Sequence, residues 1–76
     1  MNKQDRAELT KAHKMIEEAK DIIEAVGEAE QEKFDNLSEG LQQSGLGQKI
    51  ERTASDLGDL VGTLDDVLSS LDTASE

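Results

Sequence analysis

The chain has 76 residues, no cysteine and a formal charge of −10 at pH 7. This length makes one small domain, and the lack of cysteine excludes a disulfide framework and a thiolate zinc site. The acidic balance argues against direct binding to nucleic acid or to an anionic membrane, because both require clustered Lys and Arg.

A first long helix is predicted over residues 3–34, since the chain has no proline and its first glycine is Gly27. Glu, Lys and Ala, which favour helix, fill most of the remaining positions. Apolar residues recur every three or four positions and form a stripe along one side. The stripe consists of Leu9, Ala12, Ile16, Ala19, Ile23 and Val26. Met15 and Ile22 widen it.

The next segment predicts a bend with a short helical corner at about residues 37–43, because glycine, serine and asparagine cluster there. Asn36 and Ser38 are alternative N-caps for this corner. Ser44 is the predicted N-cap of the helix that follows. Apolar side chains on both sides of the bend are expected to plug this end of the fold: Phe34, Leu37, Leu41, Leu46 and Ile50.

A second long helix is predicted over about residues 46–72, with a frayed tail at 73–76. A heptad repeat runs through it and is typical of helix-to-helix packing. The heptad position is held by Ile50, Leu57, Leu64 and Leu71. The positions three residues later hold Thr53, Leu60 and Val67, which are expected to complete the seam. The positions four residues later hold Ala54, Val61 and Leu68, which flank it.

The two predicted helices are of similar length, so folding at the bend lays one stripe antiparallel along the other. The fold class expected for residues 1–76 is therefore an all-α antiparallel helical hairpin with a short helical corner. Each stripe is wider than a two-helix seam covers. The uncovered margins are expected to be Met15, Ile22, Ala54, Val61 and Leu68. We expect these residues to join two copies into a four-helix bundle, which makes a homodimer the expected state.

No enzymatic activity, metal or cofactor is expected. His13 and Glu17 lie one helical turn apart, but the chain has no second histidine and no cysteine to complete a metal site. The carboxylate pairs at Glu17-Glu18 and Asp65-Asp66 lie away from the apolar stripes, where a solvated acid is the simpler interpretation.

Two further features of the second long helix are open to two interpretations. Gly58 and Gly62 either only weaken the helix or leave a shallow groove for a partner. Acidic residues on the outer surface of the helix either only solvate it or imitate a phosphate backbone. These acids are Glu51, Asp56, Asp59, Asp65, Asp66 and Asp72.

The run from Glu30 to Gln42, together with Ser44 and Gly47, resembles a group of small acidic helical proteins encoded by bacteriophages, prophages and mobile elements. In that group the position of Ser38 often holds proline, which suits the first turn of a helix. The resemblance extends over nearly the whole chain and implies a helical hairpin of phage-type origin. The group has no settled function to transfer.

The leading functional hypothesis is a non-catalytic phage-type accessory protein that binds a host or phage protein through a helix face. A partner with a basic surface would complement the charge. One alternative is an acidic nucleic-acid mimic that inhibits a host defence nuclease, of the anti-restriction or anti-CRISPR type. A second alternative is a structural or assembly component.

No apolar run approaches the roughly 20 residues of a membrane span, and no signal-peptide core is present. The expected location is therefore the cytoplasm, which for a phage protein is the cytoplasm of the host cell.

Overall fold

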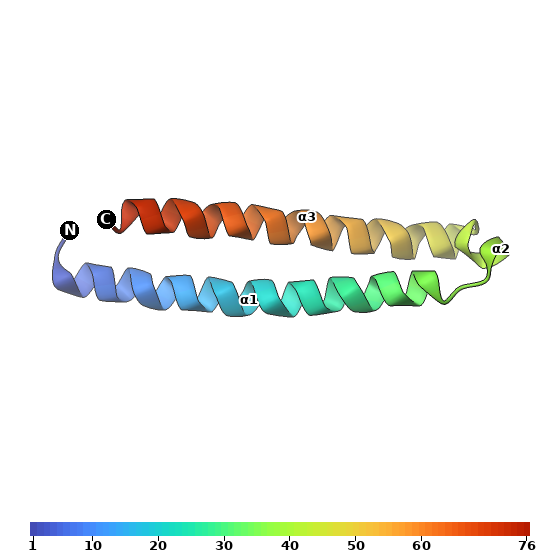
Figure 1. The fold of residues 1–76 in the computed structure, drawn as a ribbon, viewed down its shortest axis with the longest axis horizontal. Coiled ribbons are helices and arrows are strands. Elements are labelled where there is room, and N and C mark those ends of the chain that lie inside the picture. Colours follow the sequence, from blue (N-terminus) through green and yellow to red (C-terminus); the bar gives the residue numbers. More distant parts are fainter.

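The protein is a long, narrow helical hairpin in a computed structural model that describes all residues from 1 to 76. Helix α1 spans Lys3–Asp35, the single-turn helix α2 spans Glu39–Gln42, and helix α3 spans Gly45–Ala74. The two long helices lie side by side and antiparallel, with both chain ends at the end opposite α2 (Figure 1). The all-α antiparallel hairpin with a short helical corner is thus confirmed. Helix α3 extends to Ala74, so two of the four tail residues expected to fray, Thr73 and Ala74, are helical.

Each helix begins at a polar side chain that caps it. Asn2 precedes α1, and its side-chain oxygen accepts a hydrogen bond from the Asp5 amide at 2.7 Å. Ser38 precedes α2 and accepts from the Leu41 amide. Ser44 precedes α3 and accepts from the Gly47 amide at 3.2 Å. These bonds satisfy backbone N–H groups that have no partner inside the helix.

The corner between the long helices is closed by backbone contacts. The side-chain amide of Gln42 donates to the Phe34 carbonyl at 3.0 Å, which ties α2 to the end of α1. Gly47 is buried, and a Cβ there would collide with the carbonyl oxygens of Leu41 and Gln42. The corner therefore fixes which side of α3 points inward, because only a residue without a side chain fits at Gly47.

The seam between α1 and α3 differs from the expected one by one position in each helix. The heptad residues of α3 from Ile50 to Leu71 are partly buried, as expected. The other residues of the seam lie four positions after the heptad residues: Ala54, Val61 and Leu68. Among all hydrophobic residues, Ala54 and Leu68 are the most buried, each at 8% exposure. The prediction that Leu60 and Val67 complete the seam is wrong, since these side chains are 48% and 42% exposed.

Helix α1 also turns a different side toward the seam than expected, shifted by one position as in α3. Its partly buried positions are Leu9, Ala12, His13, Ile16, Lys20, Ile23, Gly27, Glu30 and Phe34. Ala19 and Val26, which were expected in the seam, are exposed. Gly27 occupies the position that Val26 was expected to fill, and a Cβ on Gly27 would lie 3.3 Å from the Leu57 Cβ. Two small inward residues, Gly27 and Gly47, thus allow the close approach that rotates both helices.

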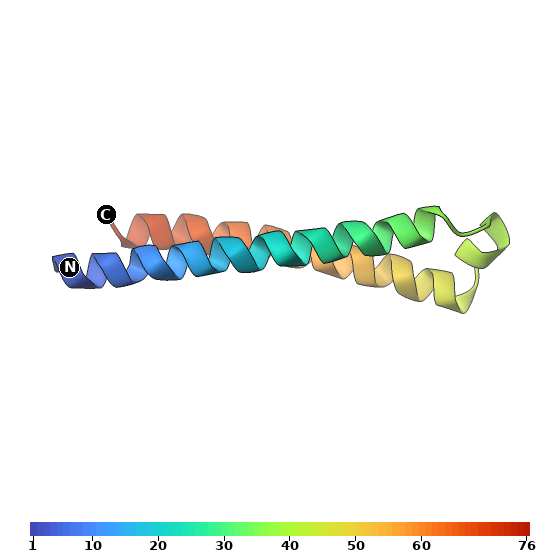
Figure 2. The same ribbon diagram turned by 90° about the horizontal axis from the view of Figure 1, so that it is seen from below.

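The hydrophobic core is thin. Only Ala54 and Leu68 are buried among the hydrophobic residues. At the corner, Phe34, Leu37 and Ile50 are partly buried as expected. The prediction that Leu41 and Leu46 join them is wrong, since these side chains are 52% and 63% exposed. Because the two helices lie in one layer and cross at a shallow angle (Figure 2), each helix has one neighbour only.

Candidate interaction surfaces

The hairpin has two broad faces, which lie on either side of the plane through both long helices. A two-fold axis perpendicular to that plane relates two antiparallel helices. Residues that follow an inward-facing position by the same number of positions in each helix therefore lie on the same face of the hairpin. Val26 and Leu60 each precede an inward-facing residue, so they share one face. Glu24 and Gly58 each follow one, so they share the other.

The first of these surfaces, the apolar face, carries large hydrophobic side chains that remain in solvent. They are Met15 at 60%, Ile22 at 65%, Val26 at 49%, Leu60 at 48% and Val67 at 42% exposure. The cross-helix register pairs Lys20 with Asp65. It also pairs His13 with Asp72, each seven residues closer to the chain termini. The same register places Val26 beside Leu60, and Ala19 beside Val67.

The structure corrects the predicted interface. Met15 and Ile22 are uncovered, as expected. The prediction that Ala54, Val61 and Leu68 are uncovered is wrong, because these three lie in the seam of the hairpin itself. The residues that replace them on the surface are Leu60 and Val67. The sequence signal that identifies the change is the pair of glycines, Gly27 and Gly47, at inward positions.

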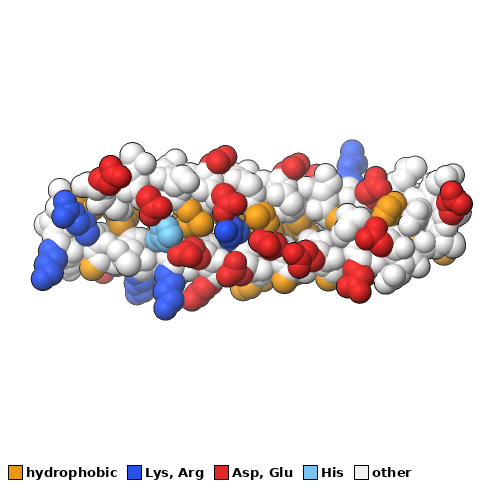
Figure 3. Space-filling model, in the orientation of Figure 1, with side chains coloured by type: hydrophobic (Ala, Val, Ile, Leu, Met, Phe, Trp, Pro, Cys, Tyr) orange, Lys and Arg blue, Asp and Glu red, His pale blue; other side chains and the backbone are white.

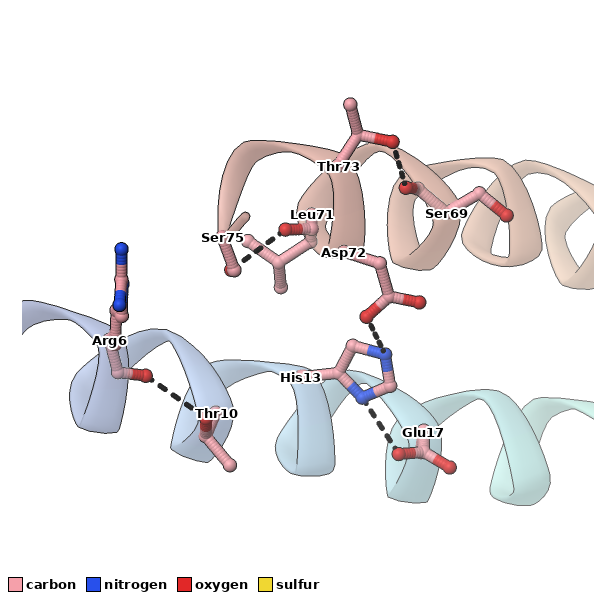
Figure 4. A network of polar contacts seen from close by, with 9 residues as sticks. All are labelled: Arg6, Thr10, His13, Glu17, Ser69, Leu71, Asp72, Thr73 and Ser75. Carbon is pink, nitrogen blue, oxygen red and sulfur yellow. Dashed lines mark hydrogen bonds and ion pairs between the residues drawn. The ribbon is translucent and has the colours of Figure 1, made fainter. Parts of the chain in front are cut away.

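The second surface, the acidic face, carries the polar contacts between the helices. His13 of α1 places Nδ1 2.8 Å from a Glu17 carboxylate oxygen and Nε2 3.1 Å from an Asp72 oxygen of α3 (Figure 4). Each ring nitrogen of His13 therefore faces one carboxylate, and the nitrogen that carries a proton is the one that donates. His13 thus lies between a carboxylate of α1 and one of α3 near the end of the hairpin that holds both chain termini, and its side chain is 28% exposed.

Lys20 makes a second link across the same face. Its Nζ lies 2.8 Å from the Asp65 carboxylate and donates a hydrogen bond to it. The hydrogen bond and the charge of Asp65 raise the pKa of the Lys20 ammonium above its ordinary value of 10.5. The aliphatic part of Lys20 occupies an inward position, so its charge is presented at the surface while its stem covers the seam.

The six acids of the predicted partner surface are all exposed: Glu51, Asp56, Asp59, Asp65, Asp66 and Asp72. Their spacing distributes them over several sides of α3. Asp65 and Asp72 lie beside the seam and contact Lys20 and His13. Asp59 and Asp66 point away from α1, since each follows the heptad position by two residues.

A groove opens on the acidic face at the middle of the hairpin, with a volume of about 250 Å³. Its walls include Ile23, Gly27, Ala54, Leu57, Gly58 and Val61. Glu24, Glu28 and Gln31 of α1 form its rim. Figure 3 shows hydrophobic atoms between the two helices on this face, flanked by acidic side chains. The groove exists because Gly27, Ala54 and Gly58 leave little side-chain volume at the same level.

The chain has neither a metal-binding cluster nor a membrane-spanning helix. No group of three or more His, Cys, Asp or Glu side chains is arranged to hold a metal ion. Neither long helix contains a stretch that is apolar enough and long enough to cross a membrane. Comparisons of the chain with protein-family models, with curated proteins and with solved structures gave no match. The two faces and the groove are thus the features on which a functional argument rests.

Proposed function

We propose that the protein is a non-catalytic interaction protein of phage type, which works as a pair of hairpins joined through their apolar faces. The second copy supplies the layer that a single hairpin lacks, and the product is a four-helix bundle. The observation that carries this proposal is the exposure of Met15, Ile22, Val26, Leu60 and Val67 on one face.

The size of the apolar face matches that of a stable interface. The hairpin measures 58 by 15 Å in the plane of its helices, so the rectangle that encloses one face has an area of about 870 Å². A standard protein interface buries about 800 Å² on each partner. A second copy therefore has enough surface to bury, provided that the two hairpins align along most of their length.

The distribution of charge also favours a second copy on this face. The charged residues at the apolar-face positions are Asp5, Glu8, Lys33, Lys49 and Asp56. Their charges nearly cancel, so almost the whole formal charge of −10 lies on the other surfaces. Two copies that meet through their apolar faces keep their acidic surfaces apart, which limits the repulsion between them.

Analytical ultracentrifugation over a range of protein concentrations tests the proposal. The wild-type chain is expected to sediment at twice its mass of 8.3 kDa. The Leu60→Glu variant is expected to sediment as a monomer, because it places a charge in the centre of the apolar face. Ser69→Glu is the matched control: it adds the same charge to α3 on the acidic side and should leave the dimer intact.

Circular dichroism of each variant shows whether the helices persist. A wild-type chain that stays monomeric at high concentration would overturn the pairing, and so would a fully dimeric Leu60→Glu variant. Charged substitutions at Val61 or Leu68 are not suitable for this test. Because these side chains lie in the seam, such changes are expected to unfold the hairpin itself.

The alternative of a nucleic-acid mimic has less support than the interaction role. Lys20 pairs with Asp65, so the charge of Asp65 is partly compensated, and Asp72 lies against the His13 ring. The remaining acids of α3 point in several directions and do not form one row. Competition between this protein and DNA for a basic nuclease, measured at low and high salt, would separate mimicry from docking on an apolar surface.

A further inference from the structure

We infer that the groove on the acidic face binds a basic amphipathic helix of a partner protein, which inserts one apolar side chain between α1 and α3. This inference rests on the proposed interaction role. It does not depend on the pairing of two copies, because the groove and the apolar face lie on opposite sides of the hairpin.

The shape of the groove fits a side chain better than a free small molecule. Its volume of about 250 Å³ is below the roughly 300 Å³ at which pockets for small ligands begin. It is open along the seam, so a segment lying between the helices can place a residue in it. Hydrophobic walls at Ile23, Leu57 and Val61 favour an apolar residue such as Leu or Met.

The charge of the rim selects a cationic partner. Glu24 and Glu28 lie one turn apart at the edge of the groove, and neither takes part in an ion pair within the chain. The nearest lysine along the helix, Lys20, is already bound to Asp65. A helix that carries Lys or Arg next to its apolar anchor would pair with both free carboxylates.

Gly58 gives the site its opening. A Cβ built on Gly58 meets nothing within 4 Å, although the residue lines the groove. A larger side chain at this position can therefore enter the groove without a clash in the backbone. Gly62 has the same open space around it, but it does not line the groove. The two glycines form a matched pair for substitution.

The test uses a labelled amphipathic peptide of about 15 residues, with Leu along one face and Lys along the other, and fluorescence anisotropy as the readout. Wild-type protein is expected to bind it saturably. Gly58→Leu is expected to weaken binding at least about tenfold, because the new side chain occupies the groove. Gly62→Leu is expected to bind as the wild type does. Both variants gain helix propensity, so a loss in one alone is not a loss of folding.

Two further measurements separate the contributions of shape and charge. The double variant Glu24→Gln, Glu28→Gln is expected to weaken binding about three- to tenfold and to reduce its dependence on salt. A peptide with Ala in place of Leu, or Glu in place of Lys, is expected not to bind. Equal binding by Gly58→Leu and wild type would overturn the inference, as would absence of binding to the Leu/Lys peptide.

The same peptide separates this inference from the proposed pairing. The Leu60→Glu variant is expected to be monomeric and still to bind the peptide. If the wild type is monomeric yet binds the peptide in a way that Gly58→Leu abolishes, the pairing fails and the groove stands. If the wild type is dimeric and binds no peptide, the groove fails and the pairing stands.

Discussion

The apolar face and the acidic face of the hairpin are built from neighbouring positions of the same two helices, but they offer different chemistry. The apolar face presents Val26 and Leu60 at its centre, with large side chains and little charge. The acidic face presents a groove at the same level, with Gly58 on its wall and Glu24 on its rim. The difference shows that a rotation by one position in each helix decides which residues are free to bind.

That rotation predicts a large contrast between two adjacent residues of α3. Leu68→Ala is expected to lower the free energy of unfolding by about 2–4 kcal/mol, because Leu68 is 8% exposed in the seam. Val67→Ala is expected to change it by no more than about 0.5 kcal/mol in a monomer. Urea denaturation in the Leu60→Glu background, which prevents pairing, measures both values. Equal losses would mean that the seam lies midway between the two positions.

The rotation is set at the corner, so a change at Gly47 should disturb both faces together. Gly47→Ala is expected to destabilise the hairpin by about 1–3 kcal/mol, because the added Cβ meets the carbonyl oxygens of Leu41 and Gln42. Gly62→Ala, where the space is open, is expected to stabilise it by about 0.5–1 kcal/mol. Thermal unfolding followed by circular dichroism compares them. A stabilising Gly47→Ala would show that the corner does not hold the helices in this rotation.

Salt should act on the two faces in opposite directions. The pairing of apolar faces is expected to strengthen a few-fold between low and physiological ionic strength, because the repulsion between two chains of charge −10 is screened. Binding of the cationic peptide to the acidic face is expected to weaken over the same range. Sedimentation and anisotropy at matched salt concentrations provide the comparison. A parallel response would indicate that both events use the same surface.

The smallest expected effect concerns Lys20, which joins the helices on the acidic face. Its pKa is raised in the folded chain, so its link to Asp65 stabilises the fold at pH values below 10.5 and is lost as the pH rises through the raised value. Lys20→Met should therefore lower the melting temperature slightly near neutral pH and not at strongly alkaline pH. Lys14→Met, which removes an unpaired lysine from the same helix, is the control. A pH-independent difference would assign the effect to the aliphatic stem of Lys20.

Much of the architecture follows from local features of the sequence. The absence of proline and the three- and four-residue spacing of apolar positions determine two long helices. Ser44 caps α3, as predicted. Of the two alternative caps for the corner, Ser38 is the N-cap of α2, whereas Asn36 is the C-cap of α1. The antiparallel hairpin follows from one short bend between two stripes of similar length. The heptad residues from Ile50 to Leu71 also face the seam as expected.

The choice between the two positions that flank the heptad could not be made from periodicity. A pattern with apolar residues both three and four positions after Leu57 and Leu64 fits either rotation. The preference depended on contacts far apart in the chain: Gly47 against the backbone of the corner, and Gly27 against Leu57. The size of the hydrophobic side chains gave the wrong prediction here. Val26 and Leu60 are larger than Gly27 and Val61, which take their places in the seam.

By itself, the sequence determined that this chain forms two amphipathic helices, that they close as a hairpin through a corner at about residues 37–43, and that more apolar surface exists than one seam can cover. The tertiary structure alone decided which apolar residues remain outside and where the groove lies. The physical reason is that the helices approach most closely where their side chains are smallest. That condition depends on what each glycine faces, which is Leu57 for Gly27 and the corner backbone for Gly47. A single helix contains no information about its partner's register.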